Sequence, residues 1–290
     1  MNLYDSSMIL KPKFSLHLNK NNINKRFQET LALNKRFIIQ TIRRPITFFT
    51  GMLQPILWLI LFGALFRNIP VQLFVRTHSY TQFLIPGIIV FTVFSGALNS
   101  GLTIIFDREF GFFNRLLVSP LISKSSIISS AMIFILIISI LQAIVVIGLS
   151  FFIEAKILSI YSFLMIIFIV SLLALGITAI SLSLAFIIPG HIEFLALILI
   201  FNLPLLFSST ALAPLSFMPL WLQIISSLNP LSFAIEGIRY FYLDLSDNNI
   251  PYIMDTIWGK LNLQNLLYYL LIFDFLVYIV NIRLIVKKLK

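Results

Sequence analysis

Few ionisable side chains in this sequence are spaced so that they could catalyse a reaction or bind a metal. Asp244 and Asp247 could offer carboxylate oxygens to Mg²⁺, but they lie in a Leu-Ser-Asp-Asn-Asn segment. That composition is typical of a turn that ends a helix, which is the other interpretation of this pair. His17, His78 and His191 are scattered along the sequence and form no cluster. The sequence therefore predicts neither a catalytic site nor a metal site.

The sequence also lacks the loop with which many ATPases hold the phosphates of ATP. A GxxxxGK[ST] loop needs a Gly-Lys pair, and the one pair present, Gly259-Lys260, is followed by Leu261 and has Met254 where the first Gly should stand. The absence of cysteine excludes disulfides, Cys-based zinc sites, iron–sulfur clusters and a catalytic thiol. We expect no cofactor on this chain, so any ATP and Mg²⁺ must be bound by a separate subunit.

Asp274 is the one ionisable residue within a long apolar segment, Leu261–Ile282. An ionisable residue at such a place is a candidate for a proton or substrate site. The alternative is a packing role, in which the carboxyl group is protonated or bonded to Tyr278, four residues later, or to a neighbouring helix. A carboxylate without other ionisable groups nearby is a poor proton relay, which favours packing.

Composition places these residues in a membrane protein. With 59% hydrophobic and 11% charged residues, a chain of 290 residues cannot hide its apolar surface inside one soluble core. The net charge of +10 could suggest nucleic acid as a partner, but the charges lie between and beside apolar runs. We therefore expect an all-α integral membrane protein that contacts anionic lipid headgroups and binds no nucleic acid.

Six transmembrane helices are predicted, because each apolar run reaches the roughly 20 residues that cross a bilayer. The fifth run is too long for one crossing and contains four prolines, so it is either two spans or one span followed by a broken segment. The charge-free runs, with the last interrupted only by Asp274, are Ile46–Phe66, Phe83–Phe106, Ser125–Ile153, Ile157–Pro189, Phe194–Ile235 and Leu261–Ile282.

The distribution of basic residues favours six spans over seven. With six spans and a cytoplasmic N-terminus, 16 of the 21 Lys and Arg residues lie on the cytoplasmic side, as the positive-inside rule requires. Both termini are then cytoplasmic. We therefore expect Phe194–Ser209 to form the fifth span and Ala213–Tyr242 to form a broken hairpin that dips in from the outer side. Within it, Asn229-Pro230 suits an N-cap followed by proline at the first position of a short helix.

The N-terminal region is polar and basic. We expect a disordered basic tail over residues 1–22 and one membrane domain over residues 23–290. Apolar residues at helical spacing predict an interfacial helix along the cytoplasmic surface, and a wholly disordered tail is the alternative. The residues on this apolar face are Ile23, Phe27, Leu31, Ile38 and Ile42.

The segment between the second and third spans carries the most distinctive pattern. From Phe106 to Leu121 it reads FDREFGFFNRLLVSPL, in which charged residues alternate with phenylalanines. Exposed aromatic residues and arginines are typical of a protein docking surface, and an ordinary interfacial loop is the alternative.

This segment resembles the membrane subunit of type-2 ABC transporters, in which a charged pair, Glu and Gly precede Arg-Leu-Leu-x-Ser-Pro. A second segment, LNPLSFAIEGIR from Leu228 to Arg239, resembles the one that these permeases carry before their last span. The sequence is also similar to plastid-encoded members, in line with its 48 Ile and 13 Ala residues, a bias typical of A/T-rich genomes.

The resemblance implies an exporter permease that pairs with a second copy of itself and with a separate ATPase. Both termini would then be on the stromal or cytoplasmic side of a plastid membrane or a bacterial inner membrane. It implies that the segment between the second and third spans forms a coupling helix that contacts the ATPase. It also implies that the broken hairpin Ala213–Tyr242 forms an outer gate. The coupling residues would be Asp107, Arg108, Glu109, Phe110, Gly111 and Arg115. The gate residues would be Asn229, Pro230, Glu236 and Arg239.

Two other functions remain open from the residues alone. A secondary transporter driven by an ion gradient would need intramembrane charge, of which Asp274 is the single example. A membrane-bound lipid transferase would need a carboxylate cluster, which the sequence lacks. The transported substrate, expected to be amphipathic or lipid-like, is not defined by the sequence.

Overall fold

The fold is a bundle of long helices, given by a computed structural model that describes residues 22–66, 79–119, 125–154, 158–243 and 252–289. The expected all-α membrane architecture is confirmed. The predicted basic tail falls almost entirely outside the described residues, as do His17, His78, Asp244 and Asp247. The long helices are α1 (Asn22–Arg43), α2 (Pro45–Leu65), α3 (Tyr80–Asn99), α6 (Ser125–Glu154), α7 (Ile160–Ile187), α8 (His191–Phe207) and α11 (Leu263–Leu289). Between them lie α4 (Gly101–Glu109), α5 (Phe112–Val118), η2 (Leu215–Phe217), α9 (Leu220–Leu228), α10 (Pro230–Tyr242), β1 (Met254–Thr256) and β2 (Gly259–Leu261).

Five helical segments of the described chain are long and apolar enough to cross a membrane, and each coincides with a predicted span. They are Phe48–Leu65, Tyr80–Glu109, Ser126–Ile153, Ile160–Ile187 and Leu263–Asn281. The remaining predicted span, the fifth, corresponds to α8, an apolar helix of 17 residues. At 1.5 Å per residue this helix is about 26 Å long, just short of a hydrocarbon core of about 30 Å.

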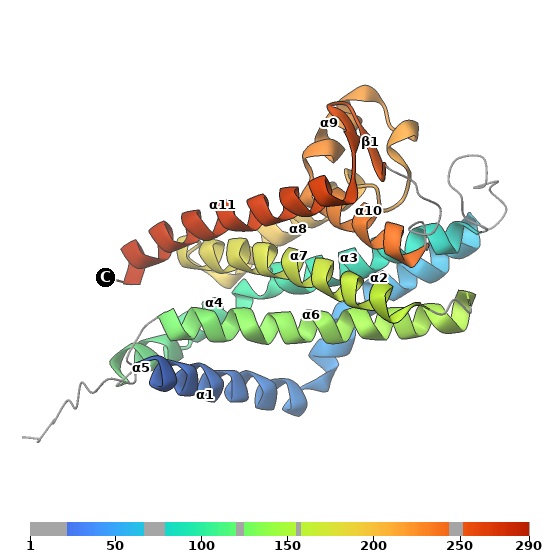
Figure 1. The fold of residues 1–290 in the computed structure, drawn as a ribbon. Coiled ribbons are helices and arrows are strands. Elements are labelled where there is room, and N and C mark those ends of the chain that lie inside the picture. Colours follow the sequence, from blue (N-terminus) through green and yellow to red (C-terminus); the bar gives the residue numbers. More distant parts are fainter. Residues whose placement is uncertain (1–21, 67–78, 120–124, 155–157, 244–251, 290) are drawn as a thin grey trace, which may run out of the picture.

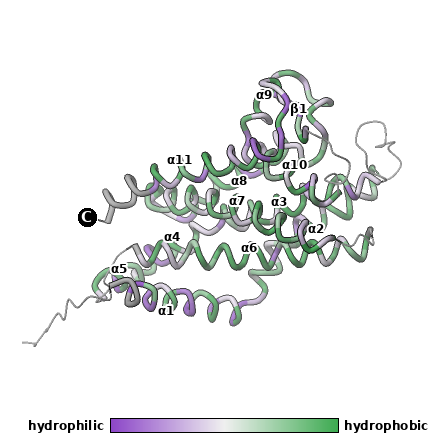
Figure 2. The backbone as a smooth tube through the Cα atoms, in the orientation of Figure 1, coloured by the Kyte–Doolittle hydropathy of each residue, from purple (hydrophilic) through white to green (hydrophobic). Residues whose placement is uncertain are grey.

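The bundle has a buried centre and a periphery that faces outward. In the most apolar part of each span, 72% of the residues are buried in the segment containing α3 and 56% in α7. Only 17% of the residues are buried in α2 and 11% in α11. Figure 2 shows hydrophobic residues along most of α6 and α7, although α6 is only 28% buried within the chain. The exposed apolar faces of the peripheral helices are therefore available to lipid or to another membrane protein.

Helix α1 confirms the predicted N-terminal helix. Its inner face packs on α6, where the ring of Phe37 stacks on Phe134 with 5.2 Å between centroids. The predicted apolar face turns away from the protein, since Phe27 is 63% and Ile42 is 71% exposed. In Figure 1, α1 runs alongside α6 and roughly parallel to it, so its expected position along the membrane surface stays a prediction.

A break between α3 and α4 separates the membrane span from the segment that follows it. Ser181 of α7 occupies this break, because its hydroxyl donates to the carbonyl of Leu98 (2.5 Å) and accepts from the N–H of Gly101 (2.9 Å). A side chain that replaces a turn of the backbone ladder in this way is a common cause of a bend in a helix.

The chain from residue 208 to Tyr242 is broken as predicted, by a turn, η2, α9 and α10. The small hairpin of β1 and β2 that follows was not predicted. Its strands pair Met254 with Leu261 and Thr256 with Gly259, which adopts φ 129° at the turn. It packs beside α9 above the start of α11 (Figure 1).

The described part of the chain begins and ends on the same side of the bundle. In Figure 1 the N-terminal end of α1 and the C-terminal end of α11 both lie at the left, beside α4 and α5. This arrangement agrees with an even number of crossings.

Candidate functional site

The segment from α4 to α5 reverses direction at Gly111. This residue has φ 72°, in the left-handed region that glycine adopts without a steric penalty, and it stands directly before α5. The reversal places two short helices at the end of the bundle where α1 and α11 also end (Figure 1). We call residues Phe106–Val118 the coupling element.

Asp107 joins the coupling element to α1. One carboxylate oxygen lies 2.6 Å from Nη2 of Arg36, and both side chains are largely buried. The guanidinium of Arg36 also lies over the ring of Phe112, 3.9 Å from its centroid. A single arginine of α1 therefore holds both arms of the coupling element through an ion pair and a cation–π contact.

Arg108 joins the coupling element to the end of α7. Its Nη1 donates to the carbonyl of Ala185 and, at 3.2 Å, to that of Ile188. These carbonyls belong to the last turn of α7 and to its C-cap, where backbone acceptors lack helical partners and the helix dipole attracts a cation.

Glu109 makes the opposite contact at the start of α8. Its carboxylate accepts from the backbone N–H of His191 (2.8 Å), the first residue of that helix, and lies 2.6 Å from His191 Nδ1. A carboxylate at a helix N-terminus satisfies free N–H groups and complements the dipole. Consecutive residues Arg108 and Glu109 thus clamp the two helix ends that flank the α7–α8 turn.

A different set of coupling residues is exposed. Phe110 is 79% and Val118 is 87% exposed, and Asn114 and Arg115 are exposed between them. Residues 110, 114 and 118 recur at the i, i+4 spacing, although Phe110 itself precedes α5. Behind them, a cavity of about 350 Å³ is lined by Arg108, Glu109 and Phe113, among others.

The structure thus divides the predicted coupling residues into two groups. Asp107, Arg108 and Glu109 bind other parts of the same chain, whereas Phe110 and Arg115 face outward. Sequence reasoning missed Arg36 and His191. The signals were a basic residue within the amphipathic N-terminal helix and a histidine directly after Pro189-Gly190, at the start of an apolar run.

The predicted gate site contains Asn229 and Pro230, which begin α10 as predicted. The Asn229 side chain accepts from the N–H of Leu231 (3.0 Å), and Pro230 occupies the first helical position. Asn229 Nδ2 also donates to the carbonyl of Leu205 (2.8 Å) and to Ser208 Oγ (3.2 Å), so one side chain joins the start of α10 to the end of α8.

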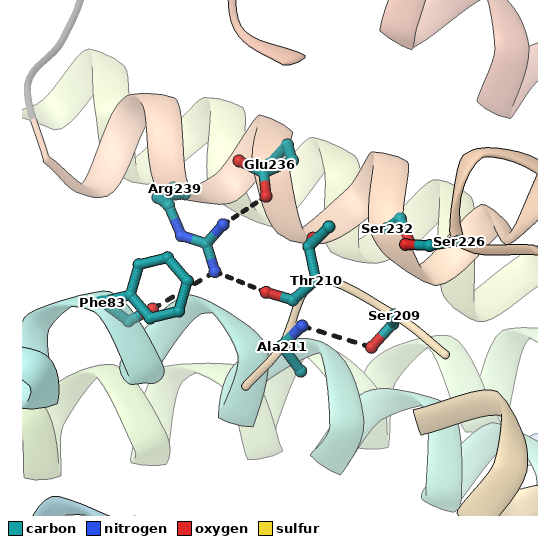
Figure 3. A network of polar contacts seen from close by, with 8 residues as sticks. All are labelled: Phe83, Ser209, Thr210, Ala211, Ser226, Ser232, Glu236 and Arg239. Atoms are coloured by element: carbon teal, nitrogen blue, oxygen red, sulfur yellow. Dashed lines mark hydrogen bonds and ion pairs between the residues drawn. The ribbon is translucent and has the colours of Figure 1, made fainter. Parts of the chain in front are cut away.

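Arg239 lies at the centre of a polar network between α10, α3 and the turn after α8 (Figure 3). Its guanidinium pairs with Glu236 one turn earlier and donates to the carbonyls of Thr210 (2.9 Å) and Phe83 (3.4 Å). The guanidinium carbon lies 3.8 Å from the centroid of the Phe83 ring. Tyr80 adds a second link, since its hydroxyl donates to the carbonyl of Leu212 (2.9 Å).

Glu236 and Arg239 pair as their i, i+3 spacing predicts, but the pair is buried within the protein, where an exposed pair was expected. The Arg239 side chain is 4% and the Glu236 side chain 12% exposed, because α3 and residues 209–211 cover them. A cavity of about 440 Å³, also lined by Gln223 and Asp255, lies beside the pair. Burial turns a weak surface pair into one whose disruption is costly.

Asp274 lies between α11 and α7. One carboxylate oxygen contacts Gly176 of α7, and that oxygen is buried with no hydrogen-bond partner among the described residues. No hydrogen bond to Tyr278 is found in the described structure. About two turns further along, Asn281 of α11 accepts a hydrogen bond from Ser183 of α7. Small and polar residues at this contact are typical of packing between membrane helices.

No group of three or more His, Asp or Glu residues within the described part of the chain is arranged to hold a metal ion. The described residues therefore give no candidate for metal chemistry, and the notable geometry is mechanical: two networks that join distant helices at opposite ends of α3.

Comparison with known proteins identifies the class of molecule. The family model described as ABC-2 type transporter matches residues 28–243. A Porphyra purpurea protein named as a transport permease, ycf38, is 54% identical over 247 residues, which is 85% of each chain. The protein of the same name from Cyanophora paradoxa is 49% identical over 247 residues, again 85% of each chain. YbhR of Escherichia coli, named as a multidrug ABC transporter permease, is 27% identical over 188 residues, which is 63% of this chain and 49% of that one. Together with the helical bundle and its coupling element, these matches show that the chain belongs to the ABC-2 type family of membrane transport permeases.

Proposed function

We propose that this chain is the membrane-spanning subunit of an ATP-driven exporter, working as a pair of identical copies with a separate ATPase that binds ATP and Mg²⁺. Its substrate is amphipathic or lipid-like. The algal relatives support a plastid membrane as its location, with the coupling element on the stromal side.

One observation carries this proposal: the three consecutive charged residues of the coupling element bind three different helices. Asp107 pairs with Arg36 of α1, Arg108 holds the end of α7, and Glu109 holds the start of α8. A force applied to the short helices α4 and α5 is therefore passed directly to the interfacial helix and to two helices of the bundle. A loop that only connected two spans would not need these contacts.

The exposed residues of the coupling element supply the surface on which that force would act. Phe110, Arg115 and Val118 present aromatic, charged and apolar groups together, the combination that energetically important protein interfaces favour. To move a transporter from mostly one state to mostly the other, the ATPase must favour one state by about 5.5 kcal/mol. Such coupling requires a tight interface and a stiff connection behind it.

The following experiment separates binding of the ATPase at the exposed surface from transmission of force through the contacts behind it. Purification of the tagged chain from its native membrane is expected to recover a P-loop ATPase, identified by its nucleotide-binding loop in mass spectrometry. Phe110→Ala with Arg115→Ala should remove the ATPase, because both side chains lie on the exposed surface. Glu109→Gln should retain the ATPase but lower substrate-stimulated ATP hydrolysis, because the charge that holds α8 is lost.

Lys260→Ala is the matched control, since it also removes a cation but lies in the β1–β2 hairpin. It should change neither copurification nor hydrolysis. If no ATPase accompanies the native chain, or if the Phe110 and Arg115 double variant retains it undiminished, the proposed function is wrong.

A further inference from the structure

A polar cavity opens at the surface of the bundle beside α2, away from the coupling element and from the Arg239 network. It has a volume of about 460 Å³ and is bounded by α2, α3, α6 and α8, with Thr41 of α1 and residues 102–103 of α4 also in its lining. None of the described residues that line it is charged. Its principal polar residues are Thr50, Gln54, Ser95, Asn99, Gln142 and Asn202.

Gln142 is the central residue of this cavity. It stands roughly 26 Å along α6 from Ser125, which places it deep in the membrane. Only 3% of the residue is exposed, and its Oε1 is buried without a hydrogen-bond partner. A carboxamide held at this depth without a partner lowers the stability of the fold.

Two glycines make room for this carboxamide. A Cβ atom at Gly96 of α3 would lie 2.9 Å from Gln142 Oε1, and one at Gly51 of α2 would lie 3.4 Å from Nε2. The amide therefore reaches between α2 and α3 into the cavity, and a side chain at Gly96 would displace it.

A second carboxamide, that of the half-buried Asn202, lines the same cavity from α8. The Oδ1 atom of Asn202 is also buried without a partner among the described residues. Each carboxamide can donate two hydrogen bonds and accept two. A bound molecule with hydroxyl or amide groups would satisfy both oxygens and recover the cost of burying them.

The remaining walls of the cavity are apolar. Phe48 of α2 and Phe134, Ile135 and Ile138 of α6 lie beside the polar residues. A ligand that fits must carry an apolar part next to its polar group. A charged headgroup would find no counter-ion in the lining, and an unpaired charge at this depth is costly.

We propose that this cavity binds the uncharged, hydroxyl-bearing headgroup of an amphipathic substrate, with Gln142 and Asn202 as its hydrogen-bonding residues. The proposal rests on the proposed function as an exporter, and it defines the class of substrate for which the exporter selects: neutral glycosyl lipids rather than anionic lipids or cationic drugs.

The absence of cysteine from the chain permits a direct binding test. Thr103→Cys places a thiol in the cavity, and Ser171→Cys places one on the exposed face of α7 as a control. Each variant is reconstituted in phosphatidylcholine vesicles with a neutral glycosyl diacylglycerol, with phosphatidylglycerol or with a cationic lipid of the same chain length. The rate of reaction with a membrane-permeant maleimide is then measured.

The glycosyl lipid should slow labelling at residue 103 about tenfold when present at roughly ten times its Kd, and the charged lipids should not. Labelling at residue 171 should be the same with every lipid. Adding Gln142→Leu, Asn202→Leu or Gly96→Ala should abolish protection, whereas Thr178→Val, which removes a buried unpartnered hydroxyl elsewhere, should preserve it.

Equal protection by a charged lipid, or protection that survives both Gln142→Leu and Asn202→Leu, would overturn the proposal. Asn202→Leu provides the test if Gln142→Leu does not fold. Copurification of the ATPase is measured on the same preparations. Loss of selective protection in a chain that retains its ATPase contradicts this substrate class alone, whereas absence of the ATPase contradicts the proposed function.

Discussion

The hydroxyl of Ser181 on α7 lies 2.9 Å from the backbone nitrogen of Gly101, at the break where α3 gives way to α4. Gly101 has no room for a side chain, because a Cβ atom there would lie 2.5 Å from the Phe194 ring and 2.6 Å from the carbonyl oxygen of Ser181. The break between the membrane span and the coupling element is therefore pressed against α7 and α8. This contact adds to those that Arg108 makes with the end of α7 and Glu109 makes with the start of α8.

Gly101→Ala is expected to push α4 away from α7 and to destabilise the fold by about 1–3 kcal/mol, the usual cost of overpacking. Substrate-stimulated ATP hydrolysis should fall further than stability alone explains, because the coupling element is displaced. Gly148→Ala is the matched control, since a Cβ atom there meets nothing within 4 Å. Thermal unfolding and ATP hydrolysis are measured together. Equal behaviour of the two variants would show that the close approach at Gly101 has no mechanical role.

Arg239→Ala is expected to destabilise the protein by about 3–5 kcal/mol, because it leaves Glu236 buried without its partner. Replacing both residues, with Arg239→Met and Glu236→Leu, should restore part of that loss. The loss of two backbone contacts to Phe83 and Thr210 should remain. Thermal unfolding in detergent distinguishes the variants. If Arg239→Ala unfolds at the wild-type temperature, the buried pair contributes little.

Asp274→Asn should preserve both stability and transport, because a carboxamide fills the same space against Gly176. Gly176→Val should be strongly destabilising, because its side chain would collide with Asp274 and with the ring of Phe273. Transport assays and thermal unfolding test both variants. Loss of transport in a stably folded Asp274→Asn protein would instead favour a proton or substrate role for the carboxyl group.

Single cysteines in the broken hairpin should react according to their burial. Those at Ser216 and at Trp221, which is 63% exposed, should be labelled, and those at Ser227 and Ser232, which are 3% and 0% exposed, should be protected. If the hairpin acts as an outer gate, trapping ATP in the partner should change reactivity at Ser227 or Ser232. Unchanged labelling at all four sites would argue for a static cap.

Tags placed at Met1 and Lys290 should be accessible from the same side of the membrane. The N-terminal end of α1 and the C-terminal end of α11 lie on one side of the bundle, and the predicted six-span topology puts 16 of the 21 Lys and Arg residues on the side of the termini. Access of protease or of an impermeant label is the measurement. Opposite accessibility would require an odd number of crossings and would contradict the six-span topology.

The sequence predicted the long helices well, because apolar runs bounded by charge directly report the length of chain that can cross a bilayer. It also predicted Asn229-Pro230 as the start of α10, since capping depends on neighbouring residues alone. The β1–β2 hairpin was missed because strands of three residues give almost no periodic signal.

Partners across long distances could not be predicted in the same way. The sequence shows that Glu236 and Arg239 are three residues apart on a helix, but only the fold shows that Phe83 and Thr210 cover them. Likewise, the charges of Asp107, Arg108 and Glu109 are visible in the sequence, while the three helices they bind are 71 to 82 residues away along the chain.

The uneven burial of the helices has a consequence for how the protein is made. Of the described spans, α2 is synthesised before the others, and only 17% of the residues in its apolar part are buried in the finished fold, so it is stable in lipid without its neighbours. The next, α3, is 72% buried and packs against α6, α7 and α10, which are synthesised later. The centre of the bundle therefore cannot close until Arg239 has been added to the chain. We expect nascent chains stopped before α10 to be inserted in the membrane, yet cleared by membrane proteases as unassembled intermediates.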